Sequence, residues 1–197
     1  MANLIITIIS IALVGVAALM GAYYAGEAFY SGQAKAKANS IVNAANQIEG
    51  AIRIWASTNM KGNTDYPDWN SVTGASSELI SGYLTQMPQP FEDKKFELLM
   101  VDSGGDMTPL TDNGTTNGPI PASGYFMGLY MQLEPSPAVT GMPLCQEINR
   151  ISVGSPTVPT TVDFMGSSAT PSILSGARFV CINDAASGKD YFIYRIN

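Results

Sequence analysis

The first 26 residues of this chain carry no charged side chain, and this feature constrains the fold more than any other. From Leu4 to Ala25 the segment is apolar apart from two hydroxyl residues and small glycines, and its length matches the roughly 20 helical residues that cross a bilayer core. The polar sequence that follows, from Glu27 to about Trp55, keeps a helical pattern. The sequence therefore predicts a segment that lies in a membrane, or in an equally apolar environment, and continues into an amphipathic helix.

The length indicates one globular domain beyond the apolar segment. The chain has 197 residues. About 140 of them remain after the predicted helix, which is enough for one core but cramped for two. We therefore expect an apolar stalk at residues 1–27 and a globular head at residues 28–197 that includes the C-terminal half of the helix. The net charge of −6 and the ten scattered basic residues argue against nucleic-acid binding, because phosphate contacts need clustered Lys and Arg.

The amphipathic part of the helix has a regular apolar face. Ala34 and Ala38 begin a series with alternating spacings of four and three, which places its members on one side of a helix. Glu49 and Arg53 form a favourable i,i+4 pair, which we expect on the outside. The residues of this face that we expect to pack on the head are Ile41, Ala45, Ile48, Ile52 and Trp55.

Small residues form a second row along the same predicted helix. They recur at every fourth position, as Ala28, Gly32, Ala36, Ser40 and Ala44, and within the apolar segment as Ala18, Ala22 and Gly26. Such rows allow helix backbones to approach closely, although Ala and Gly are also simply abundant here. A helix over about residues 1–57 is roughly 80 Å long at 1.5 Å per residue. A single head can cover only its C-terminal half, so the N-terminal half needs other partners.

The two cysteines, Cys145 and Cys181, are the only pair in the chain. An even count behind an N-terminal membrane segment favours an oxidising compartment and one disulfide. Such a bond would stabilise the head by roughly 3 to 4 kcal/mol in the chain-entropy model. The alternative is a pair of buried free thiols. A zinc site is disfavoured because the chain has no histidine and lacks the paired ligand spacing.

The remaining sequence predicts a sheet with two short helices. Ser76–Leu84 has a helical pattern, with Ser77 as a candidate N-cap, and Pro143–Ile151 has another. Four stretches have strand-like patterns, namely Lys95–Val101, Tyr125–Gln132, Ala177–Asn183 and Tyr191–Ile196. The last two predict an antiparallel hairpin. The expected fold class is thus α+β, with a long N-terminal helix packed on an antiparallel sheet and a C-terminal region bounded by the cysteines.

This arrangement resembles the type IV pilins, and by its size and opening Met1 the type IVb branch. The resemblance covers the whole architecture, but only the pattern of the stalk is specific to the family. It implies removal of a basic leader by a prepilin peptidase, an N-methylated Met1, and assembly from the inner membrane. It further implies a helical filament with packed N-terminal helices at its core and the region from Cys145 to Cys181 at its surface.

The sequence also departs from the family. Most members have a glutamate at the fifth mature position, thought to neutralise the N-terminal amine of a neighbouring subunit, whereas this chain has Ile5. A proline common near the middle of the stalk is absent too, with Ala22 and its glycine neighbours there instead. We therefore expect apolar packing alone to join the subunits, or an atypical pilin. The residues predicted to pack in the filament core are Leu4, Ile5, Ile8, Ile9, Ala12, Gly15, Ala18, Ala22 and Gly26.

Catalytic and cofactor-binding roles are not expected. Without histidine the commonest general base and metal ligand is missing, and no nucleophile-elbow, P-loop or dinucleotide motif is present. Asp102, Asp106 and Asp112 could bind calcium, but their spacing differs from that of an EF-hand. Asn113 begins a formal glycosylation sequon that is equally ordinary turn chemistry. The aromatic cluster Tyr23, Tyr24, Phe29 and Tyr30 suits either a membrane-interface belt or packing in a filament.

The expected function is that of the major structural subunit of a type IVb-like pilus, serving adhesion, aggregation or conjugative mating. Its partners would be further copies of the chain in a helical filament, the inner membrane before assembly, the pilus assembly machinery, and a host or recipient cell surface. The expected location is the inner membrane and then the extracellular pilus. The alternatives are a monomeric, membrane-anchored periplasmic binding domain and a minor pilin or pseudopilin of a secretion system.

Overall fold

The computed structural model describes three helices and six strands, together with the turns that connect several of them. The described residues are 2–61, 66–69, 75–91, 94–101, 107–109, 126–135, 143–161 and 176–196. Met1, the candidate calcium ligands Asp102, Asp106 and Asp112, and the sequon at Asn113 lie outside these residues. The long helix, the sheet and the C-terminal disulfide form a pilin-like α+β fold, as predicted.

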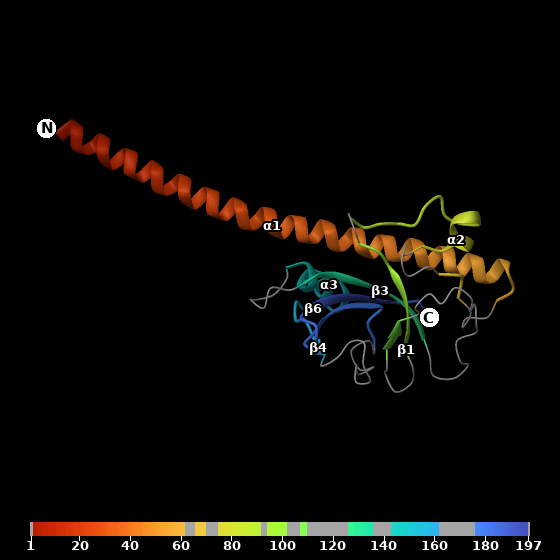
Figure 1. The fold of residues 1–197 in the computed structure, drawn as a ribbon. Helices are drawn as coiled ribbons and strands as arrows, with labels where there is room; N and C mark the ends of the chain where they lie inside the picture. Colours follow the sequence, from red (N-terminus) through yellow and green to blue (C-terminus); the bar gives the residue numbers. More distant parts are fainter. Residues whose placement is uncertain are drawn as a thin grey trace.

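The first element is a single continuous helix, α1, that spans Ala2–Thr58. Its N-terminal half extends away from the rest of the molecule, whereas its C-terminal half lies across the head (Figure 1). Among the described helices only α1 is long and apolar enough to cross a membrane. The most apolar 18-residue window of α1 has a mean hydropathy of 2.6. The predicted helix of about residues 1–57 is confirmed.

The head is built on one sheet with the strand order β2-β1-β3-β6-β5-β4. Four of its strands, β1 (Glu97–Val101), β3 (Phe126–Pro135), β5 (Phe179–Asp184) and β6 (Lys189–Arg195), were predicted to within a few residues. Neighbouring strands pair antiparallel except at one edge, where β4 (Thr160–Thr161) runs parallel to β5. The hairpin of β5 and β6 turns at Gly188, whose φ of +65° favours glycine.

The sequence patterns missed two strands and misplaced one helix cap. The strands β2 (Met107–Pro109) and β4 have three and two residues, which is too short for a period of two to be recognised. Helix α2 (Ser77–Gly82) lies within the predicted stretch Ser76–Leu84, but its N-cap is Ser76 and not Ser77. The Ser76 hydroxyl accepts a hydrogen bond from the Leu79 backbone amide at 3.2 Å, which satisfies a free donor of the first turn.

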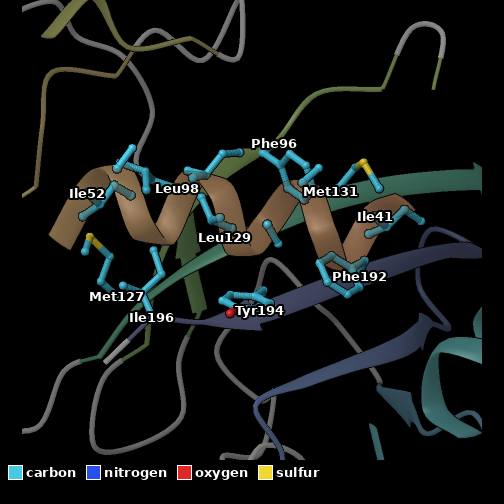
Figure 2. Packing of buried hydrophobic residues seen from close by; sticks show 14 of the residues in the cluster. Ile41, Ile52, Phe96, Leu98, Met127, Leu129, Met131, Phe192, Tyr194 and Ile196 are labelled. Atoms are coloured by element: carbon cyan, nitrogen blue, oxygen red, sulfur yellow. The ribbon is translucent and has the colours of Figure 1, made fainter. Parts of the chain in front are cut away.

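The core lies between the C-terminal half of α1 and one face of the sheet (Figure 2). Ile41 and Ile48 of α1 face Leu98, Leu129 and Phe192 of the sheet strands, and all five side chains are fully buried. Helix α3 (Pro143–Val153) contacts both α1 and β5 and closes this core at one end. The sheet and α3 therefore cover the C-terminal half of α1, whereas no described element covers the N-terminal half.

Candidate assembly surface and its attachment to the head

The exposed half of α1 carries most of the large apolar side chains that are exposed on the described part of the chain. All side chains described from Leu4 to Ala25 are exposed, with exposed fractions of 53% at Ile9 and 69% at Leu4. Monomeric soluble proteins rarely expose continuous apolar surfaces of this kind, which mark contacts with other proteins or with a membrane. The residues predicted to pack in a filament core, Leu4, Ile5, Ile8, Ile9, Ala12, Gly15, Ala18, Ala22 and Gly26, all lie on this half, and none of them is buried.

The hydroxyl groups of this segment do not make it polar. The Ser10 hydroxyl donates a hydrogen bond to the Ile6 carbonyl at 2.9 Å, one helical turn back, so its polarity is satisfied inside the helix. By length and composition the segment could cross a membrane. An apolar environment of either kind, lipid or packed protein, would therefore suit its surface.

An aromatic cluster lies where the apolar segment gives way to the polar one. Tyr23 and Tyr24 are 6.0 Å apart between ring centroids, and Phe29 and Tyr30 are 6.4 Å apart, each pair in an edge-on arrangement. All four rings are well exposed, so they do not contribute to the core of the head. Both interpretations, a membrane-interface belt and packing against other copies, remain predictions.

The other half of α1 is fixed to the sheet along one face. The five residues expected to contact the head are buried, with exposed fractions of 0% for Ile41, Ala45 and Ile48, 2% for Ile52 and 4% for Trp55. Ala34 and Ala38 extend this buried face toward the stalk. The exposed half of α1 is thus a direct continuation of a helix that is anchored by its own apolar stripe.

An ion-pair network around the buried carboxylate of Glu49 reinforces this attachment. Glu49 is only 3% exposed, and its carboxylate accepts hydrogen bonds from Arg53 Nε at 2.8 Å, from the Tyr194 hydroxyl at 2.5 Å and from Arg178. Arg53 also donates to the backbone carbonyl of Ile196 at 2.5 Å. The network therefore joins α1 to β6 and to the residue that precedes β5.

The same contacts set the protonation state of Glu49. Burial alone would raise the pKa of its carboxyl, but the hydrogen bonds from Tyr194, Arg53 and Arg178 together lower the pKa below the ordinary value of 4.5. The expectation that Glu49 and Arg53 form an outer pair was half wrong. The pair exists and Arg53 is exposed, but Glu49 points into the interface between helix and sheet. The i,i+4 spacing cannot reveal a distant partner such as Tyr194.

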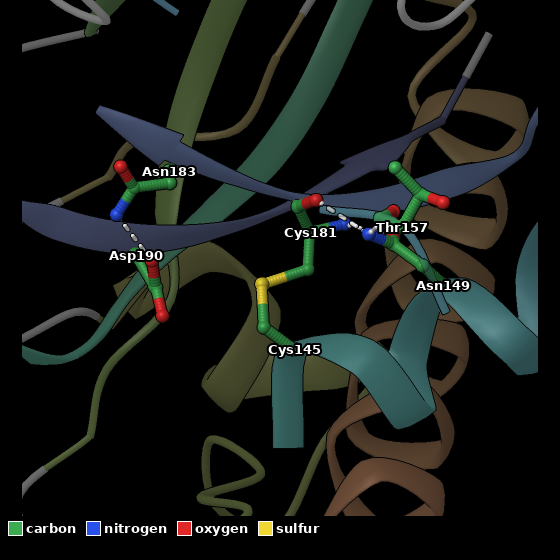
Figure 3. Close-up of a disulfide and its surroundings, with 6 residues drawn as sticks. All are labelled: Cys145, Asn149, Thr157, Cys181, Asn183 and Asp190. Carbon is green, nitrogen blue, oxygen red and sulfur yellow. Dashed lines mark hydrogen bonds between the residues drawn. A yellow bond between two sulfur atoms is a disulfide. The ribbon is translucent and has the colours of Figure 1, made fainter. Parts of the chain in front are cut away.

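The predicted disulfide is present and joins Cys145 of α3 to Cys181 of β5 (Figure 3). The alternative of two free thiols is therefore wrong. Beside the bond, the Asn149 amide donates to the Cys181 carbonyl at 2.8 Å and to the Thr157 carbonyl at 3.0 Å, while the Cys181 amide donates to Asn149 Oδ1 at 2.7 Å. Asn149 is fully buried and holds α3 on the sheet by its side chain. Nothing in its local sequence indicates this role, because its partners are far away along the chain.

Neither the metal-binding groups that were sought nor similarity to known proteins indicates a function for this surface. Among the residues that the structure describes, no group of three or more His, Cys, Asp and Glu side chains could hold a metal ion. Comparisons with protein-family models, with curated proteins and with solved structures found no match to this chain.

Proposed function

We propose that this chain is the major structural subunit of a type IVb-like pilus, in which the exposed apolar half of α1 packs against the same half of other copies. The observation that carries the proposal is the continuity of α1. One uninterrupted helix joins a head-bound half to a half whose apolar residues are exposed within the described part of the chain. A helix that is apolar all round is stable only when it is surrounded.

The length of the exposed half supports polymerisation over simple anchoring. A bilayer core accommodates about 20 helical residues, yet the first buried side chain described on α1 is Ala34. The intervening residues include Phe29 and Tyr30 of the exposed aromatic cluster and the small residues Ala28 and Gly32. These residues suit close contact between neighbouring helices better than contact with water.

In this proposal the membrane holds the subunit before assembly and other copies replace the lipid afterwards. Because Ile5 occupies the position of the usual glutamate, apolar packing must supply what a charge contact gives in the family. The finished filament would lie outside the cell and serve adhesion, aggregation or mating through its exposed heads.

Electron microscopy of sheared surface material tests this proposal. Fibres that contain this chain are expected from the unmodified protein, and Ala18→Asp or Ala22→Asp should abolish them because a carboxylate would be buried among apolar helices. The matched control is Ala185→Asp, which places the same charge on the exposed turn between β5 and β6. Equal fibre yields for Ala18→Asp and Ala185→Asp would contradict the proposed packing.

The competing function is that of a monomeric, membrane-anchored binding domain. The observation that favours it is that residues 4–25 alone are long enough to cross a bilayer. It predicts that only detergent-extracted monomer is recovered and that no fibre contains the chain. A minor pilin or pseudopilin would instead appear at low abundance within fibres built from another subunit.

A further inference from the structure

A groove on the head lies on α1, away from the sheet. Figure 1 shows the segment between α2 and β1 running back along α1, and Gln86, Pro88 and Gln89 of this segment form the second wall. The Ser40 hydroxyl donates to the Pro90 carbonyl at 2.9 Å, which ties the wall to the helix. The groove is open to solvent and has a volume of about 480 Å³, a size typical of small-molecule sites.

The chemistry of this groove is that of side-chain amides. Asn39, Asn43 and Gln47 line one side at successive turns of α1, and Gln86 and Gln89 line the other. Each amide offers two N–H donors and a carbonyl acceptor. All five are exposed, and no hydrogen bond of their side chains is recorded within the part of the chain that the structure describes. Their hydrogen-bonding capacity is thus free for a ligand.

The rest of the lining adds small or apolar groups and no charge. Ala36, Ser40 and Ala44 line the groove at every fourth position of α1, and Pro88 lies between the two glutamines along the opposite wall. Such short side chains let a ligand ring approach the helix closely. Without Lys, Arg, Asp or Glu in the lining, an ionic ligand would lose hydration and gain no countercharge.

We propose that this groove binds an uncharged, polyhydroxylated ligand, namely one or two rings of a neutral sugar. Adjacent hydroxyls of a sugar ring each need a donor and an acceptor, which is the pair that every side-chain amide presents. The spacing of one helical turn between Asn39, Asn43 and Gln47 repeats this pair along the groove. The site requires only the head and does not depend on polymerisation.

Saturation-transfer NMR on the full-length chain tests the site directly. The protein should be held in a phosphocholine detergent, because glycoside detergents carry sugar head groups that compete. The probes are maltose, lactose and N,N′-diacetylchitobiose, with sialyllactose as the charged counterpart. At least one neutral disaccharide is expected to bind, and sialyllactose should bind no more tightly than lactose.

Two variants and one control assign this binding to the groove. Asn43→Ala and Gln86→Ala, one on each wall, should each weaken binding about fivefold, since each removes hydrogen bonds to the ligand. Gln132→Ala removes an exposed amide on β3, outside the groove, and should leave affinity unchanged. Absence of binding by every neutral sugar, or equal weakening by Gln132→Ala, would overturn the proposal. A loss of fibres in Asn43→Ala with sugar binding intact would also overturn it and would make the groove a contact between copies.

Discussion

The two halves of α1 share one helix but not one environment. In the N-terminal half no residue up to Gly26 is charged, and the apolar side chains cover every face of the helix without being buried. In the C-terminal half the buried residues form a single stripe that begins at Ala34 and ends at Trp55, with polar residues on the other faces. The break between the two patterns coincides with the edge of the head.

This difference shows that the formation of a helix and the burial of its apolar side chains are separate requirements. Both halves are helical because their sequences favour local hydrogen bonding, but only the second half has a sheet to cover its apolar stripe. A stripe can be satisfied by one partner on one side, whereas an all-round apolar surface must be surrounded. The N-terminal half of α1 therefore requires apolar contacts on all sides, which lipid or a bundle of further copies would supply.

The sharpest test of this contrast is the same truncation in each half. Ile48→Ala should lower the free energy of unfolding of the head by about 2 to 5 kcal/mol, because Ile48 is fully buried and its removal leaves a cavity. Ile9→Ala should change it by less than about 0.5 kcal/mol, because this side chain is exposed on the half of α1 that extends away from the described head. Denaturation can be followed by tryptophan fluorescence, since the two tryptophans, Trp55 and Trp69, are both buried in the head. Similar losses from both changes would refute the separation of the halves.

A second test concerns the charged contact that only the head-bound half makes. Because the pKa of Glu49 is lowered in the folded state, its contribution to stability is complete above the ordinary pKa of 4.5 and is lost as the pH falls through the lower folded value. Glu49→Gln should therefore cost about 1 to 2 kcal/mol at pH 7, and much less in acid. Unfolding measured between pH 7 and pH 3 gives both values.

The matched control for this test is Glu147→Gln. Glu147 pairs with Arg150 one turn away on α3, and among the described residues its carboxylate makes no ion pair or hydrogen bond to α1 or to the sheet. Removing it should cost at most about 0.5 kcal/mol. A pH profile that is identical in the unmodified protein and in Glu49→Gln would show that the network around Glu49 adds nothing to the attachment.

The features predicted from the sequence were those with a local or repeated signal. The period of the apolar residues predicted α1 and indicated the face that begins at Ala34, and the even cysteine count predicted the bond between Cys145 and Cys181. The four longer strands had strand-like patterns, and the last two were predicted to form the antiparallel hairpin that the structure shows. In each case the information needed lies within a few residues or in a pair with no competitor.

The features that were missed depend on partners brought together by the fold. Glu49 is drawn inward by Tyr194 and Arg178, and Asn149 is placed by backbone groups of Cys181 and Thr157. The groove that Asn39 and Asn43 line has a second wall formed by Gln86, Pro88 and Gln89, which have no periodic relation to those asparagines. Spacing along one chain segment does not encode such contacts, so they became visible only in three dimensions.

The smallest expected effect compares two glycines of α1. Gly50 lies in the head-bound half, and a Cβ added there meets no atom within 4 Å, so Gly50→Ala should stabilise the head by about 0.5 to 1 kcal/mol through helix propensity. Gly21→Ala makes the same local change in the exposed half, where it should leave the unfolding free energy of the head unaltered. Fluorescence-monitored denaturation of both variants provides the comparison, with Gly154→Ala as a control that should destabilise because its φ is +76°. Equal stabilisation by Gly21→Ala and Gly50→Ala would mean that α1 and the head unfold as one cooperative unit. The exposed half would then be supported through the helix itself, and not only by partners yet to be bound.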